Sequence, residues 1–166
     1  MSRTQFTGAG RLLKADTIAD MKAPTAAEVN GAKDLTGWLR QDGLNRAQEA
    51  ATVDTATALD LFDTTDIGTR SGSFELTFYR DDTDDDAWEE LEIGTRCYMI
   101  VCPFKLKGAN DATTGLPDAA AGDKVEIWKV AVSARSNAAI GKDAAQTFTV
   151  TCAVEVPPED DAVVAA

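Results

Sequence analysis

The feature that most constrains this chain is a strict alternation of apolar and polar residues towards its C-terminal end. Segment 146–156 reads QTFTVTCAVEV, and its apolar positions are Phe148, Val150, Cys152, Val154 and Val156. Because successive side chains of a β-strand point to opposite faces, this pattern predicts a strand with one buried face. Segment 72–80, GSFELTFYR, shows the same alternation. Both segments therefore favour a sheet that covers an apolar core.

Three further segments have strand character. Residues 95–104, TRCYMIVCPF, are apolar without interruption from Cys97 to Val101, so we expect both faces of this strand to be covered. Segment 124–135, KVEIWKVAVSAR, has Val125 and Ile127 on one face and Trp128, Val130 and Val132 on the other. A weaker strand is expected at 34–40, DLTGWLR. Together these segments predict a β-rich domain.

Helical structure is expected only in short pieces. Thr25 and Glu28 have the spacing of a capping box, in which each side chain satisfies a free backbone amide at a helix start. Gly31 closes that helix after about one turn. Residues 84–92, DDDAWEELE, place Trp88 three positions before Leu91, so this helix has one apolar edge to pack on the strands.

Three regions lie outside the strand pattern. Residues 1–24 are expected to form an extended N-terminal arm, and 157–166 a tail that begins with two prolines. Residues 41–72 form a long acidic connection that permits an extended hairpin arm as readily as a coil. We therefore expect one domain, 25–156, that includes this long loop. Arms beyond one compact core favour self-assembly, because each arm is then ordered on a neighbouring copy.

Charge and composition exclude several function classes. The chain has 16 Lys and Arg against 28 Asp and Glu, a formal net charge of −12, which disfavours binding to phosphate backbones or anionic lipid. It has no histidine, which excludes Ser-His-Asp and Cys-His catalytic units and His-containing zinc sites. No signal peptide or membrane-spanning segment is recognisable. We expect a soluble protein that starts in the cytoplasm, with no membrane partner.

The cysteines and the acidic run do not predict a metal or cofactor site. Cys97, Cys102 and Cys152 lack C-x-x-C spacing, so we interpret them as small buried hydrophobic residues. Residues 81–92 hold eight acids and no base, but Ala87 and Ile93 stand where an EF-hand needs Gly and Glu. We expect these acids to cap the helix N-terminus and to form a solvated face.

Carboxylates on strands leave one enzymatic hypothesis open. Glu75, Glu126 and Glu155 lie beside apolar residues, where a pair of them would suit glycoside hydrolysis. Strand glutamates that point outward into solvent are far commoner than catalytic pairs. The glycines form neither a GxGxxG nor a Walker pattern, so no phosphate-binding loop is indicated. No catalytic residue is predicted, and we do not expect an enzyme.

Several segments, in order and spacing, resemble the major tail tube proteins of long-tailed, siphophage-type bacteriophages, especially those that infect actinobacteria. They are PTAAEVNGAKDLTGWLR, GSFELTFYRDD, AWEELEIGTRCYMIVCPF, DKVEIWKVAVSAR and QTFTVTCAVEVPP, which span about residues 24–158. The resemblance implies a mainly β fold of two packed antiparallel sheets, a β-sandwich or split barrel, with one flanking short helix.

The resemblance also implies a function. Subunits of this family form hexameric rings whose inner strands close a shared barrel, and the rings stack into a hollow conduit for phage DNA. The implied partners are further copies of the chain, a tape-measure protein, and tail-terminator and baseplate proteins, while double-stranded DNA passes through without specific binding. The implied location is the virion tail, assembled in the bacterial cytoplasm.

Candidate contact residues follow from the same resemblance. In this family a long loop between early strands reaches the adjacent ring, and 41–72 is in the corresponding place. The expected contact residues are Glu49, Asp54, Leu59, Leu61, Phe62 and Asp66. Residues expected to face the lumen are Glu75, Thr77, Lys124 and Glu126. The alternatives left open are another self-assembling β-protein, such as a secretion-tube subunit, a capsid decoration domain or a virion surface module, and an enzyme.

Overall fold

The computed structural model describes residues 10–57, 65–111, 115–138 and 145–165. The elements in chain order are β1 (Arg11–Ala15), α1 (Ala26–Asn30), β2 (Lys33–Asp34), β3 (Leu39–Asp54), β4 (Thr65–Tyr79), α2 (Asp86–Glu90), β5 (Arg96–Cys102), β6 (Lys124–Asn137), β7 (Thr147–Val154) and β8 (Glu159–Val163). The fold is mainly β with two short helices, which confirms the expected class.

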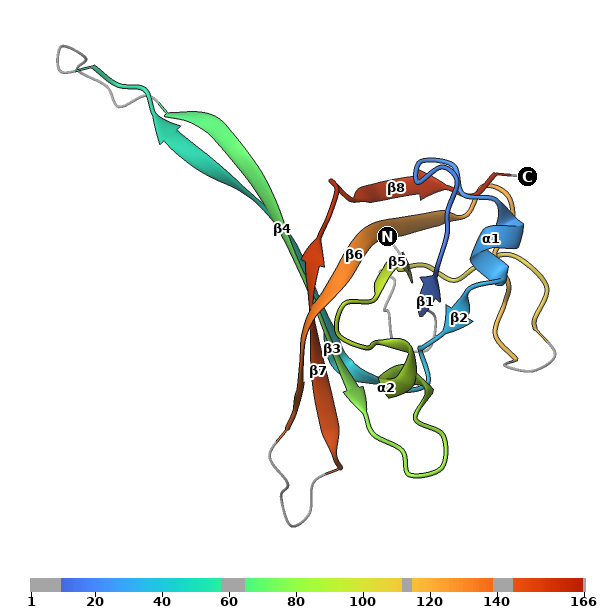
Figure 1. Ribbon diagram of the computed structural model, residues 1–166. Helices are drawn as coiled ribbons and strands as arrows, with labels where there is room; N and C mark the ends of the chain where they lie inside the picture. Colours follow the sequence, from blue (N-terminus) through green and yellow to red (C-terminus); the bar gives the residue numbers. More distant parts are fainter. Residues whose placement is uncertain (1–9, 58–64, 112–114, 139–144, 166) are drawn as a thin grey trace.

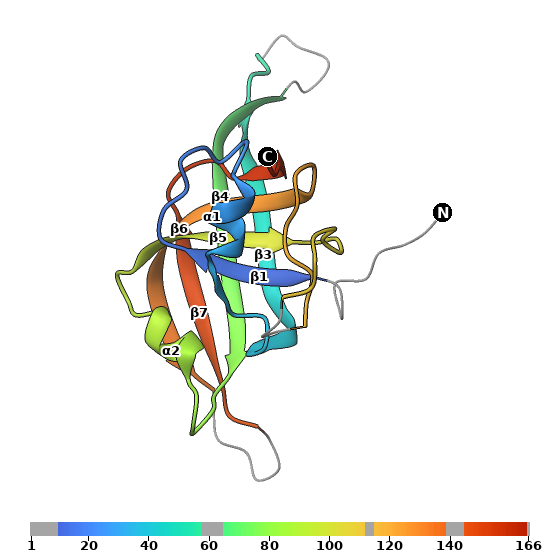
Figure 2. The same ribbon diagram turned by 90° about the vertical axis from the view of Figure 1, so that its right-hand side faces the viewer.

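All the strands belong to one antiparallel sheet in the order β2-β1-β5-β6-β7-β4-β3, with β8 also paired to β6. Strand β6 connects the two halves, because its first part pairs with β5 and β8 and its second part pairs with β7. The sheet curls, so that β1 and β5 lie to one side of β4 and β7 in Figure 1 and cross in front of β3 and β4 in Figure 2. The described strands therefore form one curled sheet, and the expected pair of separate sheets is not seen among them.

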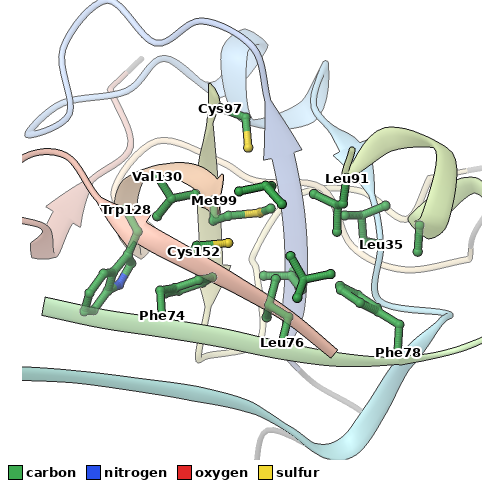
Figure 3. Close-up of a cluster of buried hydrophobic side chains, with 14 of the residues drawn as sticks. Leu35, Phe74, Leu76, Phe78, Leu91, Cys97, Met99, Trp128, Val130 and Cys152 are labelled. Carbon is green, nitrogen blue, oxygen red and sulfur yellow. The ribbon is translucent and has the colours of Figure 1, made fainter. Parts of the chain in front are cut away.

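An inner core lies between the two halves of the sheet. It includes Phe74, Leu76 and Phe78 of β4, together with Met99 of β5 and Trp128 of β6, all of them buried (Figure 3). Burial of each such side chain contributes about 1.5–3 kcal/mol. Ala87 of helix α2 and Leu91 at its C-cap belong to the same cluster. The curled sheet is thus stabilised by contacts across its own interior.

A second, outer core covers the opposite side of β1, β5 and the first part of β6. Its buried members are Leu13, Ala15, Ile18, Val29, Ile100, Cys102, Leu106, Ala119, Val125, Ile127, Ala162 and Val164. Helix α1, strand β8 and the segments 16–24, 103–111 and 115–123 supply the covering side chains. Strand β5 is consequently buried on both faces, as its uninterrupted apolar run predicted.

The side-chain patterns of the other strong strands are also confirmed. In β6, Val125 and Ile127 enter the outer core, whereas Trp128, Val130 and Val132 enter the inner core. In β7, Phe148, Val150 and Cys152 are buried, whereas Val154 and Val156, expected on the same face, are half-buried. Period-two alternation thus predicted the core-facing side of each strand, including both sides of a strand that serves two cores.

The structure corrects the expected chain ends. Arg11–Ala15, expected in an extended arm, is strand β1, which lies between β2 and β5 with all five residues buried. In the expected tail, Glu159–Val163 forms β8, and Ala162 and Val164 are buried. Strand β7 already ends at Val154, before the two prolines, and β8 begins directly after them because it pairs with β6 instead.

The early elements differ in part from the prediction. The strand expected at 34–40 is divided between β2 and β3, with a turn between them. The capping box at α1 is confirmed, since Thr25 Oγ1 accepts from Glu28 N and Thr25 N donates to Glu28 Oε2 at 2.8 Å. The fold therefore has two short helices, where the resemblance implied one beside the sheets. None of the helices in the described residues has the length and apolar character to cross a bilayer.

Candidate functional site

The expected long loop is a β-hairpin that projects from the body of the molecule (Figure 1). Its distal part, here called the projecting arm, comprises Ala47–Asp54 and Thr65–Gly72. Apart from Ala47, which pairs with Ser73 at the root, these residues pair only with each other among the described strands, because β7 accompanies β4 only from Ser73 to Tyr79. Nearly all of them are exposed. Segment 41–72 is thus an extended hairpin over most of its described length, the form that composition allowed but did not distinguish from a coil.

The projecting arm has the physical properties of a segment that a neighbouring molecule covers. Eight residues at about 3.3 Å each give it a reach of roughly 26 Å. A two-stranded ribbon without a core beneath it is only marginally stable in water. The arm also exposes Val53 and Ile67, by 52% and 66%. Apolar side chains on a ribbon of this kind favour contact with another surface.

The root of the arm is anchored to the body by side-chain contacts. Arg46 of β3 pairs with Glu126 of β6 through two contacts, one of them from Nη2 to Oε1 at 2.8 Å. Next along β3, Gln48 Nε2 donates to Asp160 Oδ2 of β8 at 2.6 Å. These contacts connect the hairpin to the opposite half of the sheet and hold its direction.

No described residue covers the outer face of β3, β4, β7 and the second part of β6. The strand registers show which side chains lie on this face. They are Asn45, Ala47, Ser73, Glu75, Thr77, Tyr79, Ala131, Ala134, Ser136, Thr147, Thr149, Thr151 and Ala153. We call this set the bare face. All its members are exposed or half-buried. They are mostly hydroxyl-bearing or small, and Glu75 alone is charged, in a chain with 27% charged residues.

The residues expected to face a lumen fall into two groups. Glu75 and Thr77 lie on the bare face, where the hydroxyl oxygens of Thr77 and Thr149 are 3.2 Å apart. Glu126 instead points into the curled sheet towards Arg46, and its side chain is 15% exposed. Lys124 lies at the start of β6 and pairs with Asp161 of β8 at 3.0 Å. The fold therefore brings only Glu75 and Thr77 together on one surface.

Three of the six residues expected to make contacts between rings are described, and all three lie on the projecting arm. Glu49, Asp54 and Asp66 are exposed on it. The other three, Leu59, Leu61 and Phe62, lie outside the described residues. Sequence reasoning missed Val53 and Ile67, although both are apolar residues within a polar strand pattern.

The acidic run is partly neutralised by cations of the body. Asp85 pairs with Arg80 at 2.5 Å, and Glu90 pairs with Lys14 at 2.6 Å. Asp86 contacts Lys33. Asp85 occupies the N-cap of α2 but makes no side-chain cap bond, so the expected capping is wrong there. No group of three or more His, Cys, Asp or Glu in the described chain is placed to hold a metal ion.

The cysteines are buried, as predicted. Burial raises the pKa of the Cys97 thiol to about 11, and the pKa values of Cys102 and Cys152 to about 12. A thiol that stays protonated at neutral pH is a poor nucleophile and a poor metal ligand. These three side chains therefore serve as packing residues.

A family model described as "Phage tail tube protein" matches residues 2–166. The chain belongs to the phage tail tube protein family. It is a structural, non-enzymatic subunit of the virion tail that assembles with copies of itself into the tail tube. The match decides between the tail-tube expectation and the other self-assembling β-proteins left open above.

Two solved structures with TM-scores above 0.5 show the same fold at low sequence identity. The SPP1 tail tube has 12% identity and a TM-score of 0.56, over 94% of this chain and 78% of that one. The tail of the empty gene transfer agent particle, refined with C6 symmetry, has 13% identity and a TM-score of 0.51, over 92% and 96%. A subunit of the native gene transfer agent virion has 13% identity and a TM-score of 0.47, over 89% and 93%. No curated protein matches the tail tube subunit.

Proposed function

We propose that this tail tube subunit forms hexameric rings whose shared inner barrel is lined by the bare face. The observation that carries the proposal is that this face is flanked on both sides by strand edges that pair with no other described strand. One edge is the outer side of β3, the last strand of the sheet. The other is Ser133–Asn137 of β6, which pairs with β7 alone because β5 accompanies β6 only as far as Ala131.

Free edges of this length invite pairing between molecules. Pairing of β3 in one copy with the second part of β6 in the next would continue the sheet from subunit to subunit. Repetition of a head-to-tail contact closes a ring when the rotation between copies divides a full turn. Closure then satisfies the backbone groups of both edges.

A sixfold ring has a suitable size. The gene transfer agent tail has C6 symmetry, which supports six copies here. Four strands from each of six copies give about 24 strands, and a spacing of about 4.8 Å gives a backbone diameter of about 37 Å before strand tilt widens it. Barrels of about 16–18 strands already leave an aqueous channel. The proposed ring thus has room for a DNA conduit.

The chemistry of the bare face suits passage of DNA without binding. Lysine and arginine side chains neutralise phosphates and make affinity strong at low salt. The bare face has neither, and Glu75 would place a ring of carboxylates in the bore. A surface of hydroxyl and small side chains with weak negative charge repels the DNA backbone and gives it no firm attachment.

The projecting arm is proposed to reach the adjacent ring along the tube. Its exposed Val53 and Ile67 would be covered there, and the Arg46–Glu126 and Gln48–Asp160 contacts set its direction. A tape-measure protein inside the tube, and tail-terminator and baseplate proteins at its ends, are the further proposed partners. The resemblance to tail tube proteins of long-tailed actinobacteriophages supports a siphophage-type tail, assembled in the host cytoplasm.

Electron microscopy of the purified subunit tests this proposal. We expect rings with sixfold symmetry and tubes of uniform width. A variant in which a short Gly-Ser linker replaces Glu49–Asp66 should keep the subunit fold, as judged by circular dichroism, and should form rings that do not elongate. A wild-type protein that stays monomeric at high concentration would overturn the ring proposal, whereas normal tubes from the deletion variant would overturn the role of the arm.

A further inference from the structure

Strand β5 connects two exposed sites of opposite character. Helix α2 and Ile93 precede β5, and Phe104 and Lys105 follow it. The seven residues of β5 span roughly 23 Å at about 3.3 Å each. Figure 2 shows α2 on one side of the molecule and the turn after β5 on the other, with the projecting arm directed crosswise to β5.

The site before β5 is acidic with an apolar centre. Glu89 and Glu92 are exposed and make no ion pair with any described residue. Beside them, Ile93 is 63% exposed. The surrounding run 81–92 contains eight acids and no base. We call Glu89, Glu92 and Ile93 the acidic patch.

The site after β5 is basic with an apolar centre. Segment 103–110, PFKLKGAN, has two lysines and no acid. Phe104 is 47% exposed, and Lys105 has no ion-pair partner among the described residues. Lys107 contacts Asp123 at 3.5 Å, yet its side chain is 69% exposed. We call Phe104, Lys105 and Lys107 the basic patch.

Each patch lies on the same side of the molecule as one of the two free strand edges. Arg135 of β6 donates from Nη1 to the Trp88 carbonyl of α2 at 2.6 Å, so the acidic patch accompanies the free edge of β6. Arg46 of β3 forms an ion pair with Glu126 of β6, and Glu126 lies opposite Val101, near the end of β5. The basic patch, which follows β5, therefore lies on the same side of the molecule as β3. Edge pairing in a ring would therefore bring the two patches of adjacent copies towards each other.

We propose that the acidic patch of one subunit docks on the basic patch of the next subunit around the ring. This inference rests on the proposed ring and names a second contact outside its inner barrel. Ile93 and Phe104 cover each other, and Glu89 and Glu92 face Lys105 and Lys107. Because like charges that meet at an interface are strongly unfavourable, the contact also selects the head-to-tail orientation.

Charge reversal in separate chains tests the pairing. Lys105→Glu and Glu92→Lys should each raise the subunit concentration needed for ring formation by at least about tenfold, because each places like charges together around the ring. An equimolar mixture of the two variants should restore assembly. In an alternating ring every acidic side chain again faces a basic one, and six positions allow strict alternation.

Lys22→Glu is the matched control, because Lys22 is exposed on segment 16–24 and belongs to neither patch. It should assemble as wild type does. Thermal unfolding of each monomer checks the fold, and ring formation is followed by sedimentation velocity. Wild-type assembly by both single variants would overturn the inference, as would a mixture that does not assemble. Failure of the wild type to form rings would instead overturn the proposed function, and the inference with it.

Discussion

At the scale of single residues, charged side chains are placed where they organise apolar ones. The guanidinium carbons of Arg80 and Arg135 lie 3.9 and 3.6 Å from the ring centre of Trp88, and Phe148 meets the same indole edge-on. Cation–π contacts of this kind contribute about 0.5–2 kcal/mol. Although the sequence around Trp88 is acidic, the contacts that attach α2 to the sheet are thus made by arginine and aromatic side chains.

A residue-scale prediction concerns the irregular start of β3. A Cβ atom at Gly43 would lie 2.3 Å from the Thr77 carbonyl oxygen, whereas one at Gly37 would meet nothing within 4 Å. We expect Gly43→Ala to lower the free energy of unfolding by about 1–3 kcal/mol, because backbone must move to admit the methyl group. Gly37→Ala is the control and should change stability little. Equal urea midpoints for the two variants would contradict this.

The buried thiols give a second prediction at this scale. With pKa values raised by burial to about 11 and 12, Cys97, Cys102 and Cys152 hold almost no thiolate at pH 8. Iodoacetamide should therefore modify the native protein at least about a hundredfold more slowly than the urea-unfolded chain. Mass spectrometry measures both rates. Rapid modification of any one cysteine in the native protein would contradict its burial.

At the scale of elements, short helices depend on their ends more than on their length. Helix α1 has only five residues, and its start is held by the capping box of Thr25 and Glu28. The Glu28 carboxylate also accepts a hydrogen bond from Ala19 N at 2.9 Å. This connects the helix to segment 16–24, which covers the outer core.

The capping box predicts a pH-dependent stability. Hydrogen bonds from the Thr25 and Ala19 backbone amides lower the pKa of Glu28 below 4.5. A lowered pKa in the folded state gives stabilisation that is present above pH 4.5 and is lost as pH falls through the folded value. We expect Glu28→Gln to destabilise the subunit at pH 7, and the difference from wild type to shrink at pH 3. Urea unfolding at both pH values measures it; a constant difference would argue against this origin.

At the scale of the whole molecule, the two outer sides of the curled sheet differ in whether other elements cover them. Helix α1, β8 and segments 16–24, 103–111 and 115–123 cover the outside of β1 and β5. No described residue covers the outside of β3, β4 and β7, and the arm continues from β3 and β4 (Figure 1). This asymmetry suits a tube wall, with a covered exterior and an uncovered inner surface.

The bare face gives the prediction at this scale. Glu75→Lys would replace the carboxylates in the proposed bore with lysines, and tubes of this variant should retain double-stranded DNA at low salt and release it as salt rises. Wild-type tubes should retain little. Asp20→Lys makes the same change of charge on segment 16–24 and serves as the control. Equal DNA retention by the two variants, measured by co-sedimentation, would contradict an inward bare face.

The sequence by itself determined the local properties of this protein. Alternation in 72–80, 124–135 and 146–156 predicted the buried face of each strand. Successive side chains of a strand point to opposite faces, so every second residue faces the core. The capping box at Thr25 was likewise visible, since its partners are three residues apart.

Only the tertiary structure decided what depends on distant partners. Pairing of β1 with β5 and of β8 with β6 made strands of segments expected as an arm and a tail. The hairpin form of 41–72 depends on the register of β3 with β4, and the direction of Glu126 on Arg46 across the sheet. Which edges stay free follows from strand order, and strand order arises from contacts between segments far apart in the chain, which no local pattern contains.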